Sequence, residues 1–522
     1  MPSQAVTRRK AAARPGAPTL SKKVRMNDID KIQTYHMFID GESVDAIDGE
    51  TFETIDPYSG KVWATMPRAK KVDAERAIEA ADKALNGPWS KLTASARGLL
   101  MFRLADLIER DTERLARIEV RDNGKLISEM RAQVGYLPQY FRYFGGLADK
   151  IEGAVPPIDK ADTFNYTRHE PLGVCVAITA WNSPLLLAVN KLAPGLAAGN
   201  TFVLKPSEFT SATAIELARL AHMAGFPPGV LNVVTGFGNE VGAPLVEHPK
   251  VAKVAFTGSE GGGRHIYQTA ARDFKHVTLE LGGKSANIVF ADANLDNAVK
   301  GAISGIFAAT GQTCVAGSRL LVQDSIHDEF VDRLVAFAKT ARIGDPQQET
   351  TQVGPITTTP QYKKILEYIE IARAEGAVCR LGGKSADLPE CGNGQFIEPT
   401  IFTEVRNDMR IAQEEVFGPV LSVIRFKDDD EAVSIANDSL YGLAAGVWTE
   451  DLRRALALPM RLKVGIVWVN MYRAVSYMSP FGGYKRSGVG RENGIEAIRE
   501  YLQTKSVWIS TAKETPDPFV IR

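Results

Sequence analysis

The sequence predicts an α/β fold with two sheets and a small additional β element. Short β-rich runs alternate with helical stretches between Gly173 and Gly283, and a second alternation begins at Ala286. Such alternation is typical of parallel strands joined by crossover helices. The chain has 522 residues, which is enough for two or three cores, so we expect two α/β domains.

Composition argues against several classes of partner. The 62 basic and 62 acidic residues balance, so no nucleic-acid partner is expected. The longest apolar stretches, such as Gly173–Ala180, fall well short of the roughly 20 residues of a membrane helix, so no membrane association is expected. Four cysteines without a CxxC pair predict neither a disulfide framework nor a metal site, and they indicate a reducing, cytoplasmic location.

Residues 1–27 carry seven Lys or Arg and no acid. Disordered tails and transit peptides share this composition, and a misplaced start, with Met26 as the true beginning, would also explain it. Because the segment lacks an apolar face with helical spacing, we predict a disordered extension.

Two helices are expected before the first sheet. From Asp73 the spacing of Ala77, Ile78 and Ala81 is helical, and Thr93 can cap a second helix. Five β-rich runs then follow, and they read VCVAIT, TFVLK, LNVVT, VAKVAF and HVTLEL. Their Val, Ile and Leu content is typical of parallel strands covered on both faces. Thr210 is expected to cap the helix that ends at Gly225.

Unusual residues stand where these five runs end. Ligands bind beyond the carboxyl ends of parallel strands. The residues that follow the runs are, in order, Trp181 and Asn182, Lys205 and Glu208, Gly236 and Gly238, Gly258 and Ser259, and Glu280. Five strand ends supplying one crevice predict a binding site.

The second domain is expected to contain a strand over NIVF, a helix capped by Asn294, the turn ATGQTCVAGS, a strand over RLLVQ and a helix from Ser325. The tail YLQTKSVWI alternates with period two and predicts a strand that could extend the sheet of another subunit.

Cys314 is the candidate nucleophile. It lies between Gly311 and Gly317 in a short polar turn that we expect to expose its sulfur, as a thiolate nucleophile requires. An inert buried thiol is the usual alternative for a lone cysteine. Glu280 ends an apolar strand, so burial is expected to raise its pKa toward that of a general base; a salt-bridged structural role is its alternative.

Lys205 and Glu208 fit the hydroxyls of an adenosine ribose, although either could be a solvated loop charge. The run TGFGNEVG has glycine spacing loosely like that of a dinucleotide loop. The full fingerprint is absent and the run follows the third strand, so it carries little weight alone.

Seven motifs, in order, resemble the aldehyde dehydrogenase superfamily: AWNSP, NTFVLKPSE, FTGS, LELGGK, GQTCVAGSR, EEVFGPV and PFGGYKRSGVGRE. The resemblance covers the chain from Phe38 to Trp508. It implies an aldehyde dehydrogenase-like fold with a Rossmann-like cofactor domain. The implied reaction is NAD(P)-dependent oxidation of an aldehyde to an acid, by hydrolysis of a cysteine thioester.

The resemblance also implies roles for individual residues. Cys314 attacks the aldehyde, Asn182 and the Cys314 N–H stabilise the oxyanion, and Glu280 activates water. Lys191 and Glu492 would relay protons. The residues implied to contact the cofactor are Thr179, Trp181, Lys205, Glu208, Gly238, Gly258, Ser259, Leu281, Glu415 and Phe417.

The sequence departs from common family members in the helix implied to bind the pyrophosphate. Glu260, Gly261 and Gly262 replace a small hydroxyl residue, an acid and a β-branched apolar residue. Glu208 favours NAD because a carboxylate repels a 2′-phosphate, while the glycine run leaves NADP open.

The residues expected to contact substrate are Ser183, Asn190, Thr313, Arg473, Val475 and Phe481. Ser183 and Asn190 stand where apolar residues are frequent, which makes the tunnel more polar. We hypothesise that Arg473 faces a carboxylate or carbonyl of a semialdehyde or hydroxylactone; a simple aliphatic or aromatic aldehyde is the alternative. The stretch YRAVSYMSPFGGYKRSG is similar to that of hydroxylactone-type dehydrogenases. Arg473 could instead point to solvent or a neighbouring subunit.

The predicted organisation is a dinucleotide-binding domain over 28–148 and 172–282, a catalytic domain over 283–497, and an oligomerisation element over 149–171 and 498–512. This element would build a homodimer or a homotetramer. A CoA-acylating dehydrogenase is a rival function that Glu280 argues against. A non-catalytic scaffold is another, and it would not need Cys314, Glu280 and Asn182 together.

Overall fold

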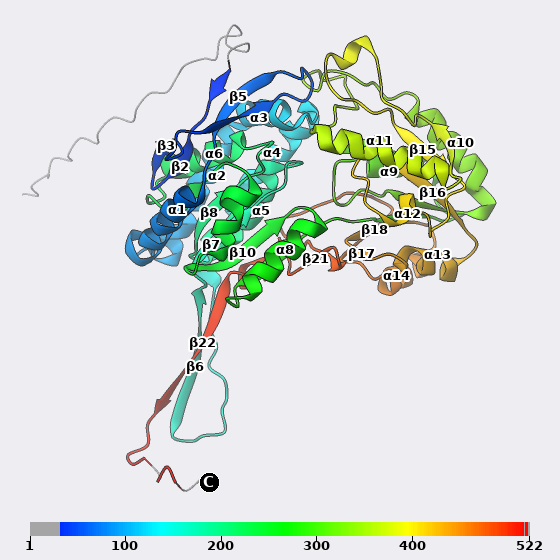
Figure 1. Cartoon of the computed structure of the whole chain (residues 1–522). Coiled ribbons are helices and arrows are strands. Elements are labelled where there is room, and N and C mark those ends of the chain that lie inside the picture. The colour runs from blue at the N-terminus through cyan, green and yellow to red at the C-terminus, as the bar shows by residue number, and fades with distance from the viewer. Residues whose placement is uncertain (1–31, 516, 520–522) are drawn as a thin grey trace, which may run out of the picture.

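The structure is a computed structural model that describes residues 32–515 and 517–519. The predicted extension over 1–27 therefore lies outside the described residues. Two lobes stand side by side, and a two-stranded arm projects away from them (Figure 1). Each lobe is built on its own large sheet.

The sheet of the first lobe has the strand order β21-β11-β10-β7-β8-β9-β2-β3. Its five central strands run parallel and coincide with the five β-rich runs of the sequence. They are β7 (Val174–Ile178), β8 (Thr201–Lys205), β9 (Leu231–Val233), β10 (Val251–Thr257) and β11 (His276–Glu280). The flanking strands are β2 (Met37–Ile39), β3 (Glu42–Val44) and β21 (Gly488–Val489). A separate small sheet contains β1 (Gln33–Thr34), β5 (Val62–Pro67) and β4 (Thr51–Ile55).

Helices cover both faces of this sheet. Cys175 and Phe202 pack among α2 to α6, whereas Val176 and Val203 pack among α1, α7 and α8. Alternate strand residues thus enter different cores, which explains the continuous apolar runs. The helices are α1 (Lys71–Ala84), α2 (Ala94–Arg110), α3 (Thr112–Asn123), α4 (Ile127–Leu147), α5 (Pro184–Ala197), α6 (Ala212–Ala224), α7 (Ala243–Glu247) and α8 (Glu260–Ala271).

Two of three predicted helix caps are confirmed. The Thr93 hydroxyl accepts the Ala96 N–H, and the Asn294 side chain accepts the Asn297 N–H. The Thr210 cap is wrong, because the helix begins one residue later, at the N-cap Ser211. There the Ala212 N–H donates to Oδ2 of Asp122, 3.1 Å away on α3. A residue distant in sequence supplies this cap, so local spacing could not identify it.

The second lobe contains a seven-stranded sheet in the order β14-β15-β16-β13-β12-β18-β19, parallel except for β14. Its strands are β12 (Ala286–Val289), β13 (Arg319–Gln323), β14 (Val378–Leu381), β15 (Thr400–Thr403), β16 (Val420–Phe426), β18 (Ala444–Trp448) and β19 (Ile466–Val469). One face packs on α9 (Leu295–Phe307) and α10 (His327–Ala338). The other packs on α11 (Thr359–Ala374), α12 (Arg410–Gln413), α13 (Asp429–Asn437) and α14 (Leu452–Arg461).

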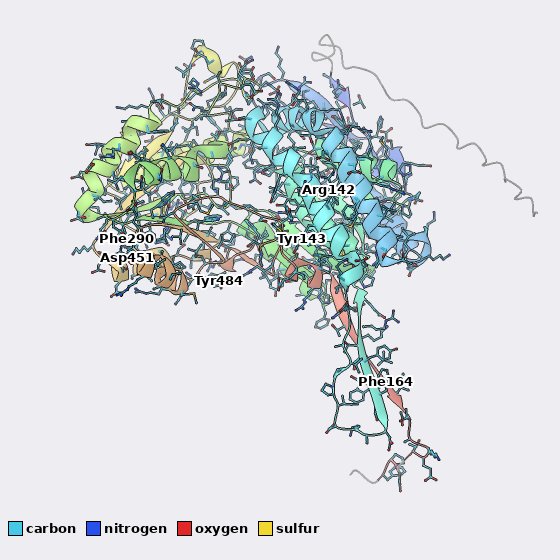
Figure 2. All side chains as sticks on the ribbon, turned by 180° about the vertical axis from the view of Figure 1, so that it is seen from behind. Arg142, Tyr143, Phe164, Phe290, Asp451 and Tyr484 are labelled. Atoms are coloured by element: carbon cyan, nitrogen blue, oxygen red, sulfur yellow. The ribbon has the colours of Figure 1, made fainter. Side chains whose placement is uncertain are left out.

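The C-terminal stretch crosses from the second lobe to the first. β20 (Tyr484–Lys485) pairs with β17 (Tyr441–Gly442), and β21 then pairs with β11 of the first sheet. After the short helix α15 (Glu496–Arg499), β22 (Leu502–Ser510) pairs antiparallel with β6 (Thr163–Pro171) along its length. This pair forms the arm, and both of its strands lie within the segments 149–171 and 498–512 that were expected to form one element. Figure 2 shows Phe164 on the arm, away from both lobes.

Within the described residues, no helix is long and apolar enough to cross a membrane.

Candidate active site

A cavity of about 680 Å³ opens beyond the carboxyl ends of the five parallel strands. All ten residues predicted to contact the cofactor line it, and so do Cys314, Glu280 and Asn182. Gly236 is not among the lining residues; its φ of 135° serves the turn after β9. The crevice predicted from five strand ends is therefore present, and the second lobe closes it through Cys314, Glu415 and Phe417.

The far end of the cavity from Cys314 contains a buried cation and an acid. Nζ of Lys205 donates to the Pro206 carbonyl at 2.9 Å and lies 4.0 Å from Oε2 of Glu208. Burial lowers the pKa of Lys205 to about 8, and the charge of Glu208 opposes this shift. Both side chains remain able to bind hydroxyl groups, as a ribose would require.

The unusual first turn of α8 borders the same cavity. The Ser259 hydroxyl accepts the Gly262 N–H at 3.2 Å and caps the helix. The Glu260 carboxylate accepts hydrogen bonds from Arg264 at 2.6 Å and Arg486 at 3.2 Å. These two guanidinium groups offset the charge that Glu260 places at the helix N-terminus, where anions bind.

The end near Cys314 is shaped by residues 415–417. Oε1 of Glu415 accepts the Gly283 N–H at 2.9 Å, and burial raises the pKa of Glu415. A Cβ on Gly282 would overlap this carboxylate, so a larger residue there would displace the Glu415 side chain from its present position. Phe417 has a φ of 60° and meets Trp181 edge-on at 5.3 Å between ring centroids. Gln361 secures this strained residue by donating to its carbonyl.

The loop that holds Cys314 requires a left-handed backbone. Ala309 and Thr310 both have φ values of 52°, and Gly311 has 68°. A Cβ on Gly311 would overlap the Gly418 carbonyl oxygen, so this loop packs directly on the loop that holds Phe417. Cys314 is half-buried beside Phe481 in a small apolar cluster, not exposed as the polar turn had predicted.

This environment opposes ionisation of the thiol. Burial raises the pKa of Cys314 to about 12, with further contributions from Glu280 and Glu415, while the N–H groups of Cys314 and Val315 lower it. The ready thiolate expected from the sequence is therefore absent from this conformation, and the thiol needs a base at neutral pH.

Among the charged side chains, Glu280 acts most strongly on the Cys314 thiol. It is buried at the end of β11, with Oε1 2.8 Å from where a Cβ on Gly482 would stand and Oε2 without a hydrogen-bond partner. Burial raises its pKa well above the usual range, the charge of Glu492 adds to this, and Lys191 and Arg491 oppose it. The predicted rise in pKa is confirmed.

Lys191 and Glu492 form a buried ion pair. Nζ of Lys191 donates to Oε1 of Glu492 and, at 2.6 Å, to Oγ1 of Thr257. Asn190 donates to Oε2 of Glu492 at 3.3 Å. Asn190, predicted to line the substrate tunnel, thus also supports this pair.

Asn182 is tied to the nucleophile loop. Its Nδ2 donates to the Gln312 carbonyl at 3.0 Å, which fixes the amide and leaves its second N–H available.

The remaining predicted substrate residues do not line the large cavity. Ser183 accepts a hydrogen bond from Lys125 at 2.6 Å, and Arg473 donates to the Ser304 carbonyl at 3.3 Å. Thr313 is half-buried and Val475 is 41% exposed. Lys125 was not predicted as a site residue, and neither were Gln361 and Lys364, which line the cavity from α11. No local pattern around Lys125 in the sequence indicates that it is buried.

Within the described part of the chain, no cluster of three His, Cys, Asp or Glu side chains could hold a metal ion.

Comparison with known proteins decides the family. Residues 44–507 match the model of the aldehyde dehydrogenase family. The chain belongs to this family. The predicted fold class and the assignment to an NAD(P)-dependent aldehyde dehydrogenase are therefore confirmed.

Relatives of this aldehyde dehydrogenase cover nearly its whole length. A (Z)-2-((N-methylformamido)methylene)-5-hydroxybutyrolactone dehydrogenase of Acinetobacter baylyi is 46% identical, over 94% of this chain and 100% of the relative. A mitochondrial aldehyde dehydrogenase of Rattus norvegicus is 46% identical, over 92% of each chain. The crystal structure of a Staphylococcus aureus betaine aldehyde dehydrogenase in complex with NAD+ has a TM-score of 0.93, with 41% identity over 95% of this chain and 99% of the other.

We predict that Glu280→Gln slows alkylation of Cys314 by iodoacetamide near neutral pH, because burial keeps the thiol protonated and the variant removes the carboxylate that can take its proton. The rate should fall about tenfold or more, at or below the lower end of the usual contribution of a general base. Mass spectrometry of the Cys314 peptide measures the rate, with half-buried Cys379 as the internal control. An unchanged rate would show that Glu280 does not accept the proton of Cys314.

Proposed function

We propose that this enzyme oxidises a polar or anionic aldehyde to a carboxylic acid through a covalent intermediate on Cys314. The observation that carries the proposal is the single cavity that unites Cys314, Glu280 and Asn182 with the ten residues suited to a dinucleotide. A non-catalytic scaffold would have no need for a buried carboxylate close to a half-buried thiol.

NAD is the cofactor of this enzyme, as the sequence predicted. The cavity fits NAD. Lys205 and Glu208 suit the ribose hydroxyls, and the space beside Gly238 is open, because no atom lies within 4 Å of a Cβ built on this glycine. Ser259 and the first turn of α8 would face the diphosphate, while Glu415 and Phe417 would hold the nicotinamide end. We propose that NAD is preferred over NADP because the Glu208 carboxylate repels a 2′-phosphate.

The first step forms a carbon–sulfur bond. The Cys314 thiol gives its proton to Glu280, whose raised pKa suits it as acceptor, and the sulfur adds to the aldehyde carbon. The carbonyl oxygen becomes an oxyanion, which the free N–H of Asn182 and the Cys314 N–H stabilise. Bound NAD, held by Glu415 and Phe417 at its nicotinamide end, would supply the hydride acceptor, and loss of a hydride from the hemithioacetal carbon leaves a thioester on Cys314.

The second step cleaves the thioester. Glu280 must first lose the proton it took from Cys314, and the adjacent pair of Lys191 and Glu492 offers it a route. Glu280 then removes a proton from water, hydroxide adds to the thioester carbon, and the carbon–sulfur bond breaks with Cys314 as leaving group. The product is a carboxylic acid, and no CoA is required.

Polar side chains beyond Cys314 support a polar substrate. Ser183 is hydrogen-bonded to Lys125, and Asn190 is hydrogen-bonded to Glu492. The Arg473 guanidinium is half-exposed and donates to the Ser304 carbonyl, which leaves further N–H groups available. The Acinetobacter relative is named for a hydroxybutyrolactone substrate. We therefore propose an aldehyde of the semialdehyde or hydroxylactone type, with Arg473 facing its carboxylate or carbonyl.

We also propose that the arm joins copies of this chain in a homodimer or homotetramer. It presents exposed apolar side chains, Phe164 (47%), Trp508 (56%) and Ile509 (45%), which favour burial against a partner. Light scattering after size-exclusion chromatography should give a multiple of 56.8 kDa, and a monomer would contradict the proposal.

A cytoplasmic location is proposed as well, since all four cysteines are free thiols. Recovery in the cytosolic fraction after cell fractionation would support it.

The central test is reduction of NAD with aldehydes in the absence of CoA. Cys314→Ala should abolish it, because no bond to the aldehyde can form. Glu280→Gln should lower steady-state turnover about 100- to 10,000-fold, the usual contribution of a general base. Activity retained by Cys314→Ala, or a strict need for CoA, would reject the mechanism.

Arg473→Ala tests the polar substrate. The Michaelis constant for carboxylate-bearing aldehydes should rise roughly 2- to 10-fold, because a half-exposed charge pair is partly screened. The Michaelis constant for neutral aldehydes should not change. Arg453→Ala, which changes an exposed arginine on α14, is the matched control. An equal Michaelis constant for acidic aldehydes in both variants would reject the role of Arg473.

A further inference from the structure

Lys125 is a buried cation that the mechanism does not use. It follows Gly124, whose left-handed backbone ends α3, and it precedes α4. Its N–H donates to Oδ1 of Asn123 at 2.8 Å, and the residue is only 6% exposed. The backbone thus directs a lysine inward at a fixed position, although burying an ammonium group is costly unless a partner is present.

The protein satisfies only part of the hydrogen-bonding capacity of the Lys125 ammonium group. Nζ of Lys125 donates to Oγ of Ser183 at 2.6 Å, and no carboxylate in the described residues lies within 4.0 Å of it. An ammonium group can donate three hydrogen bonds. Burial lowers the pKa of Lys125 to about 8, as expected for a cation without an ion-pair partner.

The position of Lys125 places it beside the reacting thiol. Ser183 directly follows Asn182, whose amide is bonded to the Cys314 loop. The charges that act on Lys125 come from Glu129 on α4, Arg473, Glu119 on α3 and Cys314. Neither Lys125 nor Ser183 is among the residues that line the cofactor cavity, whereas Asn182, the neighbour of Ser183, lines it beside Cys314.

We propose that Lys125 binds a carboxylate on the substrate and, with Ser183, selects anionic aldehydes. The inference rests on the proposed function and deepens it, because it identifies a binding group deeper than half-exposed Arg473. Activation of the thiol is a weaker explanation, since Glu280 and Glu415, not Lys125, are the main charges that act on Cys314. An ion pair with Glu129 is also weaker: one oxygen of Glu129 accepts the Ala309 N–H, and the other has no partner.

Matched pairs of aldehydes test the proposal. The probes are ω-carboxy aldehydes of three to five carbons, each beside the n-alkanal of equal chain length, with NAD and the full-length enzyme. For Lys125→Met, kcat/KM for the favoured carboxylate should fall roughly 10- to 100-fold, as expected for loss of a hydrogen bond to a charged group. The kcat/KM value for the matched alkanal should not change. Lys71→Met, which changes an exposed lysine on α1, controls for net charge.

The pH profile of the unmodified enzyme gives a second readout. The ratio of kcat/KM for the carboxylate to that for the alkanal should fall as pH rises through about 8, because Lys125 then loses its proton. Titrations of Cys314 and Glu280 affect both aldehydes and cancel in the ratio. Burial raises the pKa of Glu119 to about 7, so it is already ionised above that pH. Lys125→Met should make the ratio independent of pH.

Several results would overturn the inference. If Lys125→Met slows the oxidation of both aldehydes equally, the lysine is structural. If the unmodified enzyme does not prefer carboxylates, or if the ratio of the two kcat/KM values does not change with pH, no titrating cation selects the substrate. The pH profile is measured on the unmodified enzyme, so it tests the proposal even if Lys125→Met fails to fold. Absence of oxidation with every aldehyde would instead reject the proposed function.

Discussion

The pairing of β21 with β11 is the contact on which the site depends. Gly488 stands opposite Glu280 in this short antiparallel register, and the Leu281 N–H donates to the Ser487 carbonyl. The pairing draws the segment that carries Glu492 onto the carboxyl edge of the first sheet. The second lobe thereby meets that edge, and its Cys314 lines the same cavity as Glu280 of the first lobe. Gly488 is needed because a Cβ there would overlap the Leu279 carbonyl.

Burial of ionisable groups follows from this closure and controls their chemistry. Burial raises the pKa of Glu280 and of Cys314 and lowers the pKa of Lys125, so the charged form of each group becomes less stable. The thiol therefore keeps its proton at neutral pH, whereas Lys125, with a pKa of about 8, is still largely a cation. The ion pair of Lys191 and Glu492 is a further charged element, and its hydrogen bonds to Thr257 and Asn190 compensate for lost water.

Both of the loops that touch across the site contain strained backbone. Positive φ values at Ala309, Thr310 and Phe417 are costly for residues with side chains. They persist because each loop packs on the other at Gly311 and because Gln361 holds the carbonyls of the second loop. The loop that holds Cys314 and the ring of Phe417 are therefore held in place by the same contact.

The sequence by itself determined the five parallel strands, the crevice at their ends, the caps at Thr93 and Asn294, and the strand in the tail. Each follows from periodicity or from local residue chemistry. Tertiary structure alone decided the Asp122 cap at Ala212, the half-burial of Cys314, and the place of Lys125 beside Ser183. The physical reason is that solvent exposure and electrostatic environment are set by whatever packs against a residue, and here the packing partners lie tens to hundreds of positions away along the chain.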